Sequence, residues 1–362
     1  MERGVDIAGI SIPFAAGVIA GNVLIGFVCG HNLLGINILA STSLLTAVIM
    51  AISLLRWRCG GITIAALFFT AGLFTSSSHS MTLSSSGQAE HTVHALESLQ
   101  AAIASIPFRE ERTGALLTAL LTGDRSLLGQ DTVNAFRDSG ASHILALSGL
   151  HLGIIHFLLH KILGTMGNAG AMRIIRAAGT VAACIFYTLM AGAGPSLVRA
   201  CLFIAITEIS SLFPERRTSP AGTLLCVLTI QLALKPESVA ELGFQLSYLA
   251  MCGIILVFPK MKGWYPAEGF RMDPFRKMWE GISLSVSCQL FTAPLVWMRF
   301  HTFPEYFMLT NLIAMPLTSL TMTAAVGTLL LNFAGICPHG LVRLTEVFAG
   351  ALMESLELIS GL

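Results

Sequence analysis

Ionisable side chains are concentrated within residues 114–153 of a chain that is otherwise strongly apolar. An ionisable group beside hydrocarbon costs free energy, so such groups usually serve a function rather than packing. Two of them, Arg125 and Arg137, carry guanidinium groups that can bond two oxygens of a phosphate at once. Their chemistry suits contact with an anionic polymer. The alternative for residues 123–126 is an ordinary corner between helices, with a local pair between Asp124 and Arg125.

Histidines occupy positions 143 and 151, so a helix over residues 143–160 would carry both of them on one face. Two histidines without a third ligand make a poor metal site, so we expect interior histidines and no bound metal. Ser148 lies one position off that face, and its Leu-Ser-Gly context resembles the motif of intramembrane serine proteases. An intramembrane serine hydrolase with Ser148 as its nucleophile is therefore one possible function, the least favoured of three. No later membrane span carries a histidine that could act as its base.

Glycine and proline interrupt an apolar run at Gly194 and Pro195, just before Ser196 and Arg199. Exposed N–H groups at the start of the following helix would favour binding of an anion. A secondary transporter of a small anionic solute is therefore a second possible function. The same residues also fit a tight turn whose Arg199 side chain extends to the membrane interface. The sequence leaves both interpretations open.

Uncharged polar side chains occur within several other apolar runs, namely at Gln245, Ser247, Gln289 and Asn311. Each of them taken separately fits a hydrogen bond between helices. Taken together they predict a polar interior.

The composition indicates a membrane protein. The chain has 362 residues, of which 54% are hydrophobic and 11% charged, whereas a soluble domain has about 25% charged residues. The apolar runs are long and do not alternate, so we predict an all-α polytopic membrane protein with about ten or eleven transmembrane helices. The expected spans are 7–29, 36–55, 61–76, 143–160, 174–190, 197–213, 220–234, 241–258, 281–298 and 307–331. The eight cysteines show no C-x-x-C spacing, which indicates small buried side chains rather than disulfides or a zinc site.

The distribution of basic residues predicts the orientation of these spans. With the N-terminus in the cytoplasm, about two thirds of the lysines and arginines fall on the cytoplasmic side, so residues 77–142 face outward. We expect this segment to begin with a polar linker over residues 76–87. At the other end of the chain, residues 343–362 have polar positions at helical spacing, which fits an interfacial helix, a helix along a polar lumen or a final span.

Three helices are predicted within the outward segment. The first is amphipathic, lies on the membrane surface and ends at Pro107; its apolar stripe consists of Val93, Leu96, Leu99, Ile103 and Ile106. The second stops at Gly123, and the third is capped by Asp131 at its start and by Gly140 at its end.

Several stretches resemble the transmembrane competence domain of the ComEC family, whose members are inner-membrane DNA channels of natural transformation. They read ALLTGDRS, FRDSGASHILALSGLHLG, GPSLVRA, ELGFQLSYLA and, after a TAP, LTNLIAMPL. The resemblance covers roughly residues 109–362 and implies a competence-type channel domain there. Before it, the apolar runs predict N-terminal transmembrane helices at 1–76 and an outer linker with an amphipathic helix at 77–108. It places the following residues in family motifs or along the path of the DNA: Gly123, Asp124, Arg125, Phe136, Arg137, Gly140, Ser142, His143, Ser148, Gly149, His151, Gly194, Pro195, Ser196, Arg199, Gln245, Ser247 and Asn311.

By this resemblance the chain would be a channel in the bacterial cytoplasmic membrane that admits single-stranded DNA, with no catalytic, metal or cofactor site of its own. Full-length members usually also carry an OB-fold and a metallo-β-lactamase-like nuclease domain, and the sequence shows neither, so we expect a minimal member, one of a split pair or a truncated member. The expected partners are single-stranded DNA, the lipid bilayer and separate nuclease, DNA-receptor and cytoplasmic translocase proteins. A homo-oligomer is left open.

Overall fold

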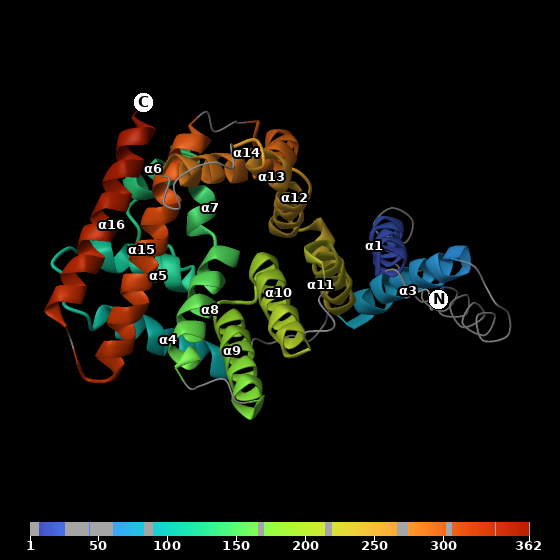
Figure 1. Cartoon of the computed structure of the whole chain (residues 1–362), viewed down its shortest axis with the longest axis horizontal. Coiled ribbons are helices and arrows are strands. Elements are labelled where there is room, and N and C mark those ends of the chain that lie inside the picture. The colour runs from blue at the N-terminus through green and yellow to red at the C-terminus, as the bar shows by residue number, and fades with distance from the viewer. Residues whose placement is uncertain are drawn as a thin grey trace. The chain divides into compact units, whose positions relative to one another are not determined.

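The computed structural model describes residues 7–25, 43, 61–82, 90–165, 170–213, 219–265, 274–301, 306–336 and 338–361. Across these residues the regular elements are helices and no strand occurs, which confirms the all-α prediction (Figure 1). The chain divides into two compact units. The first comprises Met1–Gln88 and Ala205–Gln245, and the second comprises Ala89–Ile204 and Leu246–Leu362.

The apolar runs of the sequence form helices of membrane-spanning character. Within the described residues, five are long and apolar enough to cross a membrane: α1 (Ile7–Leu24), α9 (Gly170–Met190), α10 (Pro195–Leu212), α14 (Pro274–Phe300) and α15 (Phe307–Phe333). Shorter apolar helices are α8 (Gly149–Gly164), α11 (Pro220–Leu234), α12 (Leu242–Leu256) and a stretch of α3 (Gly61–Thr82). The chain is therefore a multi-pass helical membrane protein. The expected span at 36–55 lies outside the described residues apart from Ser43, so the number of ten or eleven spans stays a prediction.

In the first unit, α1 and α3 pack backbone against backbone. A Cβ atom on Gly17 would lie 2.0 Å from the carbonyl oxygen of Phe69, and one on Gly72 would lie 2.2 Å from that of Phe14. Only glycine fits at such a crossing, as is common between membrane helices. The helix α11 also packs on α1 (Figure 1).

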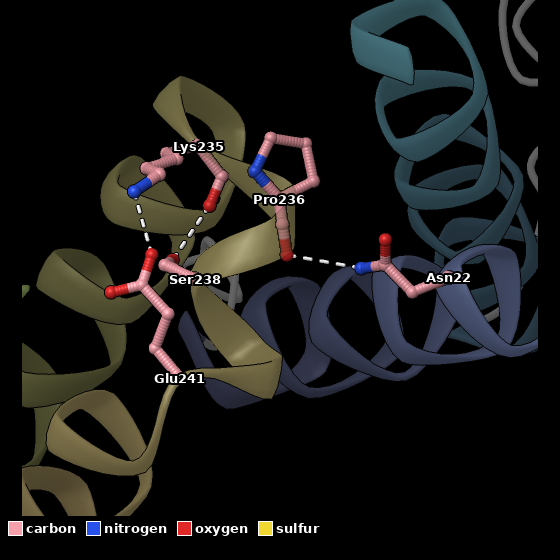
Figure 2. A network of polar contacts seen from close by, with 5 residues as sticks. All are labelled: Asn22, Lys235, Pro236, Ser238 and Glu241. Carbon is pink, nitrogen blue, oxygen red and sulfur yellow. Dashed lines mark hydrogen bonds and ion pairs between the residues drawn. The ribbon is translucent and has the colours of Figure 1, made fainter. Parts of the chain in front are cut away.

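A short 3-10 helix, η2 (Pro236–Ala240), follows α11 and is fixed to α1 by polar contacts (Figure 2). The Asn22 amide donates to the carbonyl oxygen of Pro236 at 3.0 Å, and the Lys235 ammonium pairs with the Glu241 carboxylate at 2.6 Å. The Ser238 hydroxyl donates to the Lys235 carbonyl at 2.6 Å. Glu241, the first residue of the ELGFQLSYLA stretch, therefore helps to hold the turn that leads into α12.

In the second unit, the segment of residues 90–145 folds against the C-terminal helices. It contains α4 (Glu90–Ala104), α5 (Glu111–Thr122), α6 (Gln130–Asp138) and α7 (Ser142–Leu145), and it packs on α15 and α16 (His339–Ser360). The shared core includes Leu116, Leu120, Phe136, Ile144, Met322, Leu352 and Leu356. Between α12 and α14, the short helix α13 (Phe258–Lys262) packs on α14.

The helices predicted for this segment are present, but the structure corrects two details at their ends. Residue Asp131 does not cap α6, because the N-cap is Gly129 and Asp131 lies in the first turn. At the other end the C-cap is Ser139, and Gly140 follows it with a φ of 81°. The polar linker expected at 76–87 also begins later, since α3 continues to Thr82.

The apolar stripe of α4 packs within the protein. Ile103 and Ile106 are buried in the core shared with α5 and α15, and Leu99 packs against the same core. We had expected the stripe to lie on the lipid surface. Protein side chains cover these three residues instead.

The last stretch is a helix, α16, whose buried face consists of Val342, Thr345, Ala349, Leu352, Met353, Leu356 and Ile359. Two apolar residues lie off this buried face, since Leu344 and Val347 are exposed at 43% and 57%. The predicted helical spacing is correct, but the face that packs within the protein does not include every apolar position.

Candidate functional site

The corner after α5 is held by Asp124. Gly123 ends α5 with a φ of 80°, a left-handed conformation that favours glycine. The Asp124 carboxylate accepts the backbone N–H of Ser126 at 2.9 Å and the Gln100 amide at 3.0 Å. The bond from the Ser126 N–H is the main reason that the pKa of Asp124 lies below its usual value. Asp124 thus has a local structural role, as an Asx turn provides.

Arg125 and Arg137 are both exposed cations of the 90–145 segment. Among the described residues Arg125 forms no ion pair, so the local pair with Asp124 expected for an ordinary corner is not formed. Arg137 pairs with its neighbour Asp138 at 3.1 Å, a contact that water screens strongly. By contrast Phe136, from the same motif, is 1% exposed and belongs to the core, so it does not line a path.

The helix expected over residues 143–160 is broken, which is a correction to the sequence prediction. α7 ends at Leu145 and α8 starts at Gly149. Ser148 is the N-cap of α8: its hydroxyl accepts the N–H of Leu150 at 3.3 Å, and its own N–H donates to Nδ1 of His151 at 3.2 Å. Such a reciprocal capping box starts a new helix, so it competes with continuation of the old one.

As a result, the two histidines do not share a helix face. His143 lies in α7, where its Nδ1 donates to the carbonyl oxygen of Gly140 at 3.2 Å, and the neighbouring Ser142 is exposed. His151 is completely buried at the start of α8. Because a backbone N–H can only donate, Nδ1 of His151 is an acceptor and its proton is on Nε2. This Nε2 has no hydrogen-bond partner among the described residues.

The chain between α9 and α10 forms the tight turn that was one of the two interpretations. Gly192 and Ala193 both have positive φ angles, 81° and 48°. After Gly194, Pro195 is the first residue of α10, where its fixed φ suits a helix start. The turn leaves Arg199 one turn into α10.

Arg199 does not simply extend to the interface, because its guanidinium group contacts α12 and lies beside the start of α8. Its Nη1 donates to the carbonyl oxygen of Ser247 in α12 at 2.6 Å, and the group lies 6.0 Å from the centre of the Tyr248 ring. A Cβ atom on Gly149 would lie 3.5 Å from Nη2. The Ser196 and Ser247 hydroxyls are 3.1 Å apart, which adds a second link between α10 and α12.

These contacts join three motif stretches that are far apart in the sequence. We call the group the Arg199 cluster; it consists of Ser148, Gly149, His151, Ser196, Arg199, Ser247 and Tyr248. Among the described residues no carboxylate forms an ion pair with Arg199. The cluster therefore carries a positive charge that the described part of the protein does not neutralise.

Two motif residues are not linked to this cluster by hydrogen bonds of the described residues. The Gln245 amide donates to the carbonyl oxygen of Val239 at 2.9 Å, a local bond. Asn311, in α15, has a buried Oδ1 without a partner among the described residues. The sequence analysis missed Tyr248 and the pairing of Ser148 with His151. The three-residue spacing of a helix cap was the available signal for the pairing.

The described cysteines Cys184, Cys201, Cys226, Cys252 and Cys288 are free. The expected burial holds for the first two, whereas the other three are partly exposed. Cys184 and Cys201 pack in a core between α8, α9 and α10.

The fold and the cluster define a class: a multi-pass helical membrane protein with a partly buried, unneutralised cation where helix starts meet. A family model described as "Competence protein" matches residues 120–362, and the chain belongs to that family. This confirms the ComEC resemblance inferred from the motifs.

Curated relatives extend this comparison. The chain is 28% identical over 228 residues to ComE operon protein 3 of Bacillus subtilis, a match that covers 60% of this chain and 27% of that protein. It is 23% identical over 250 residues to the uncharacterized protein YcaI of Escherichia coli, covering 66% and 31%. An uncharacterized Aquifex aeolicus protein is 26% identical over 160 residues, covering 43% and 36%. The matches thus span about a third of these relatives' length. No solved structure matches the chain significantly.

Proposed function

We propose that this protein forms a path by which single-stranded DNA crosses the bacterial cytoplasmic membrane. The support is its membership of the competence family together with the Arg199 cluster, in which three motif stretches from different helices meet around one cation. Single-stranded DNA carries a charge on every phosphate, so a path for it needs cationic or polar contacts that release the strand again.

The orientation proposed from basic residues places the N-terminus in the cytoplasm and the 90–145 segment outside. Arg125 and Arg137 would then be exposed where the strand arrives. We further propose that separate nuclease, DNA-receptor and cytoplasmic translocase proteins act with this chain, as its membership of the competence family suggests. The Arg199 guanidinium would contact the phosphates of the strand within the membrane.

The first prediction concerns the exposed arginines. The double change Arg125→Ala and Arg137→Ala should lower the initial rate of uptake of labelled DNA into native cells by about tenfold, because two exposed contacts with phosphate at about 0.7 kcal/mol each correspond to that factor. The loss should shrink as the salt concentration rises, since salt screens the same contacts.

Arg173→Ala is the matched control, because Arg173 is also exposed but lies near the start of α9, on the proposed cytoplasmic side. Its uptake should stay near that of the unchanged protein. Equal uptake by the double variant, at equal amounts of protein in the membrane, would remove these arginines from the path.

One observation favours a second candidate, a serine hydrolase. The Ser148 hydroxyl lies 3.1 Å from Nδ1 of His151, the distance of a nucleophile from its base. However, both groups already serve the helix cap, and the other ring nitrogen has no orienting partner among the described residues. We therefore expect this pair to cap α8 and to perform no catalysis.

The second prediction separates these roles. Ser148→Ala should lower stability by about 1 kcal/mol, the usual contribution of an N-cap, and should reduce DNA uptake only in part, because Ser148 caps α8 whereas the charge of the cluster is on Arg199. A fluorophosphonate probe should not label the unchanged protein at Ser148. Labelling that disappears in Ser148→Ala, with complete loss of function in a folded variant, would instead establish the hydrolase.

A small-solute transporter is distinguished by its substrate. In proteoliposomes it would couple the transport of a small anion to that of protons or sodium ions, and it would not transport DNA. Uptake of labelled DNA that depends on Arg125 and Arg137 argues against it.

A further inference from the structure

We infer that the Arg199 cluster is a binding site for a single phosphate group, which on the proposed function is one phosphodiester of the passing strand. That the phosphate belongs to DNA rests on the proposed function. That the cluster binds a phosphate group does not. Three groups of hydrogen-bond donors carry it, and each comes from a different part of the cluster.

The first donor group is the guanidinium of Arg199. It has five N–H donors in a planar fork, and one of them is used by the carbonyl oxygen of Ser247. Since no carboxylate pairs with it among the described residues, its charge needs another anion. A cation in a membrane helix is costly without such a partner.

The second donor group is the start of α8, a helix of 16 residues. The first N–H groups of a helix have no partner within it and carry a partial positive charge. The Ser148 hydroxyl satisfies the N–H of Leu150. At Gly149 the start of α8 lies beside Nη2 of Arg199, since a Cβ atom there would be 3.5 Å from Nη2 and 3.5 Å from the Ala200 side chain. An oxyanion that Arg199 binds would therefore lie next to this helix start.

The third donor is Nε2 of His151. The ring belongs to the same helix end, because its Nδ1 accepts the N–H of Ser148. The side chain is 0% exposed, and its protonated Nε2 lacks an acceptor among the described residues. Buried N–H groups almost always have an acceptor, so this one requires an oxygen that the described residues do not supply.

The Arg199 guanidinium, the first N–H groups of α8 and Nε2 of His151 are all hydrogen-bond donors. Such donors favour an oxyanion over a metal cation as the ligand. An arginine fork matches the oxygens of a phosphate well, and helix starts bind phosphate groups in many proteins. A single arginine also lets the strand leave, since conduction requires weak sites.

The test uses the full chain purified in maltoside micelles, which contain no phosphate, with a labelled oligothymidylate as the probe. Arg199→Gln should weaken binding by about tenfold, as expected for loss of hydrogen bonds to a charged group. It should also lower the slope of log affinity against log salt concentration by about 0.7, the value for one phosphate of a single strand. An oligothymidylate with neutral methylphosphonate linkages should bind Arg199→Gln and the unchanged protein alike.

Two further variants keep the test independent of folding. Gly149→Ala retains the charge, and its Cβ atom makes only ordinary contact with Arg199, so the protein should fold and still bind several-fold more weakly. Arg173→Gln is the matched control, because Arg173 is an exposed arginine of α9 in the same unit. Its affinity and salt slope should not change. An equal loss in Arg173→Gln, or full binding by folded Gly149→Ala and Arg199→Gln, would overturn the site.

A second arm separates the site from the proposed function. Sodium phosphate should raise the melting temperature of the unchanged protein relative to sodium chloride of equal ionic strength, and Arg199→Gln should lose this shift. If the shift is present but oligothymidylate does not bind, the phosphate site stands and the DNA path fails. If oligothymidylate binds without dependence on Arg199, the DNA path stands and the site fails. Stronger competition by phosphatidylglycerol than by oligothymidylate would assign the phosphate to a lipid headgroup and refute the strand as its source.

Discussion

Phe136→Ala is expected to destabilise the second unit by about 3–5 kcal/mol, the usual cost of removing a buried phenylalanine side chain. Phe136 is 1% exposed and belongs to the core that α6 shares with α5, α15 and α16. The substitution leaves a cavity that rigid neighbouring helices cannot fill. Unfolding can be followed with a thiol-reactive fluorescent dye, because Cys184 of the same unit is 0% exposed and reacts only when the unit opens.

Phe157→Ala is the matched control, since Phe157 lies in α8 with 53% of its surface exposed. It should change the melting temperature little, because exposed apolar side chains contribute little packing. Phe136→Leu should fall between the two. Equal melting temperatures for Phe136→Ala and Phe157→Ala would show that Phe136 is not a core residue, and its motif would then need a functional explanation.

Gly253→Ala is expected to cost stability at the upper end of the range of about 1–3 kcal/mol for overpacking. A Cβ atom at position 253 would lie 2.1 Å from the carbonyl oxygen of Ser287 and 2.8 Å from its carbonyl carbon. Both are backbone atoms of α14, so no side-chain rotation relieves the overlap and α12 must move away from α14. Since α12 also carries Ser247, the hydrogen bond to Arg199 should weaken, and oligothymidylate binding should fall together with stability.

Gly350→Ala provides the control for the same chemical change. A Cβ atom at position 350 meets no other atom within 4 Å, and alanine favours a helix over glycine by about 1 kcal/mol. This variant of α16 should therefore melt at the same or a slightly higher temperature. The close approach of α12 to α14 would be disproved by a Gly253→Ala variant that melts like the unchanged protein.

The positions of the membrane helices could be predicted from the sequence because their cause is local. A long apolar run must satisfy its own backbone hydrogen bonds, so it becomes a helix whatever it packs against. Thus α1, α11, α12 and α15 begin within a residue or two of their predicted starts. The face that each helix buries depends on its neighbours. This is why the buried face of α16 and the covering of Ile103 were not predicted.

The break before α8 was missed for a related reason. Residues 143–160 are apolar enough for one helix, and the spacing of the histidines favoured that interpretation. The competing signal was the reciprocal bonding of Ser148 with His151, in which histidine takes the place usually held by glutamate. One continuous helix over residues 143–160 and a break with a new helix at Gly149 differ little in free energy. The few hydrogen bonds of the Ser148 cap are therefore enough to favour the break.

For the candidate site, the motifs identified the right residues but not their roles. Arg199, Ser247 and Gly149 were singled out separately, and the fold brings them together. Phe136 stood in the same group, yet it is a packing residue. Motif membership does not separate contact with a ligand from contact with the core, since either can require a particular side chain.

The packing of the 90–145 segment has a consequence for how the protein is made. Its helices leave the ribosome well before α15 and α16, whose side chains cover Leu116 and Ile103. Until those last helices are inserted, the earlier ones have an uncovered apolar face and depend on the bilayer or the insertion machinery for shelter. Maturation of this unit is therefore a late step, and damage to α16 should first appear as turnover of newly made chains by quality-control proteases.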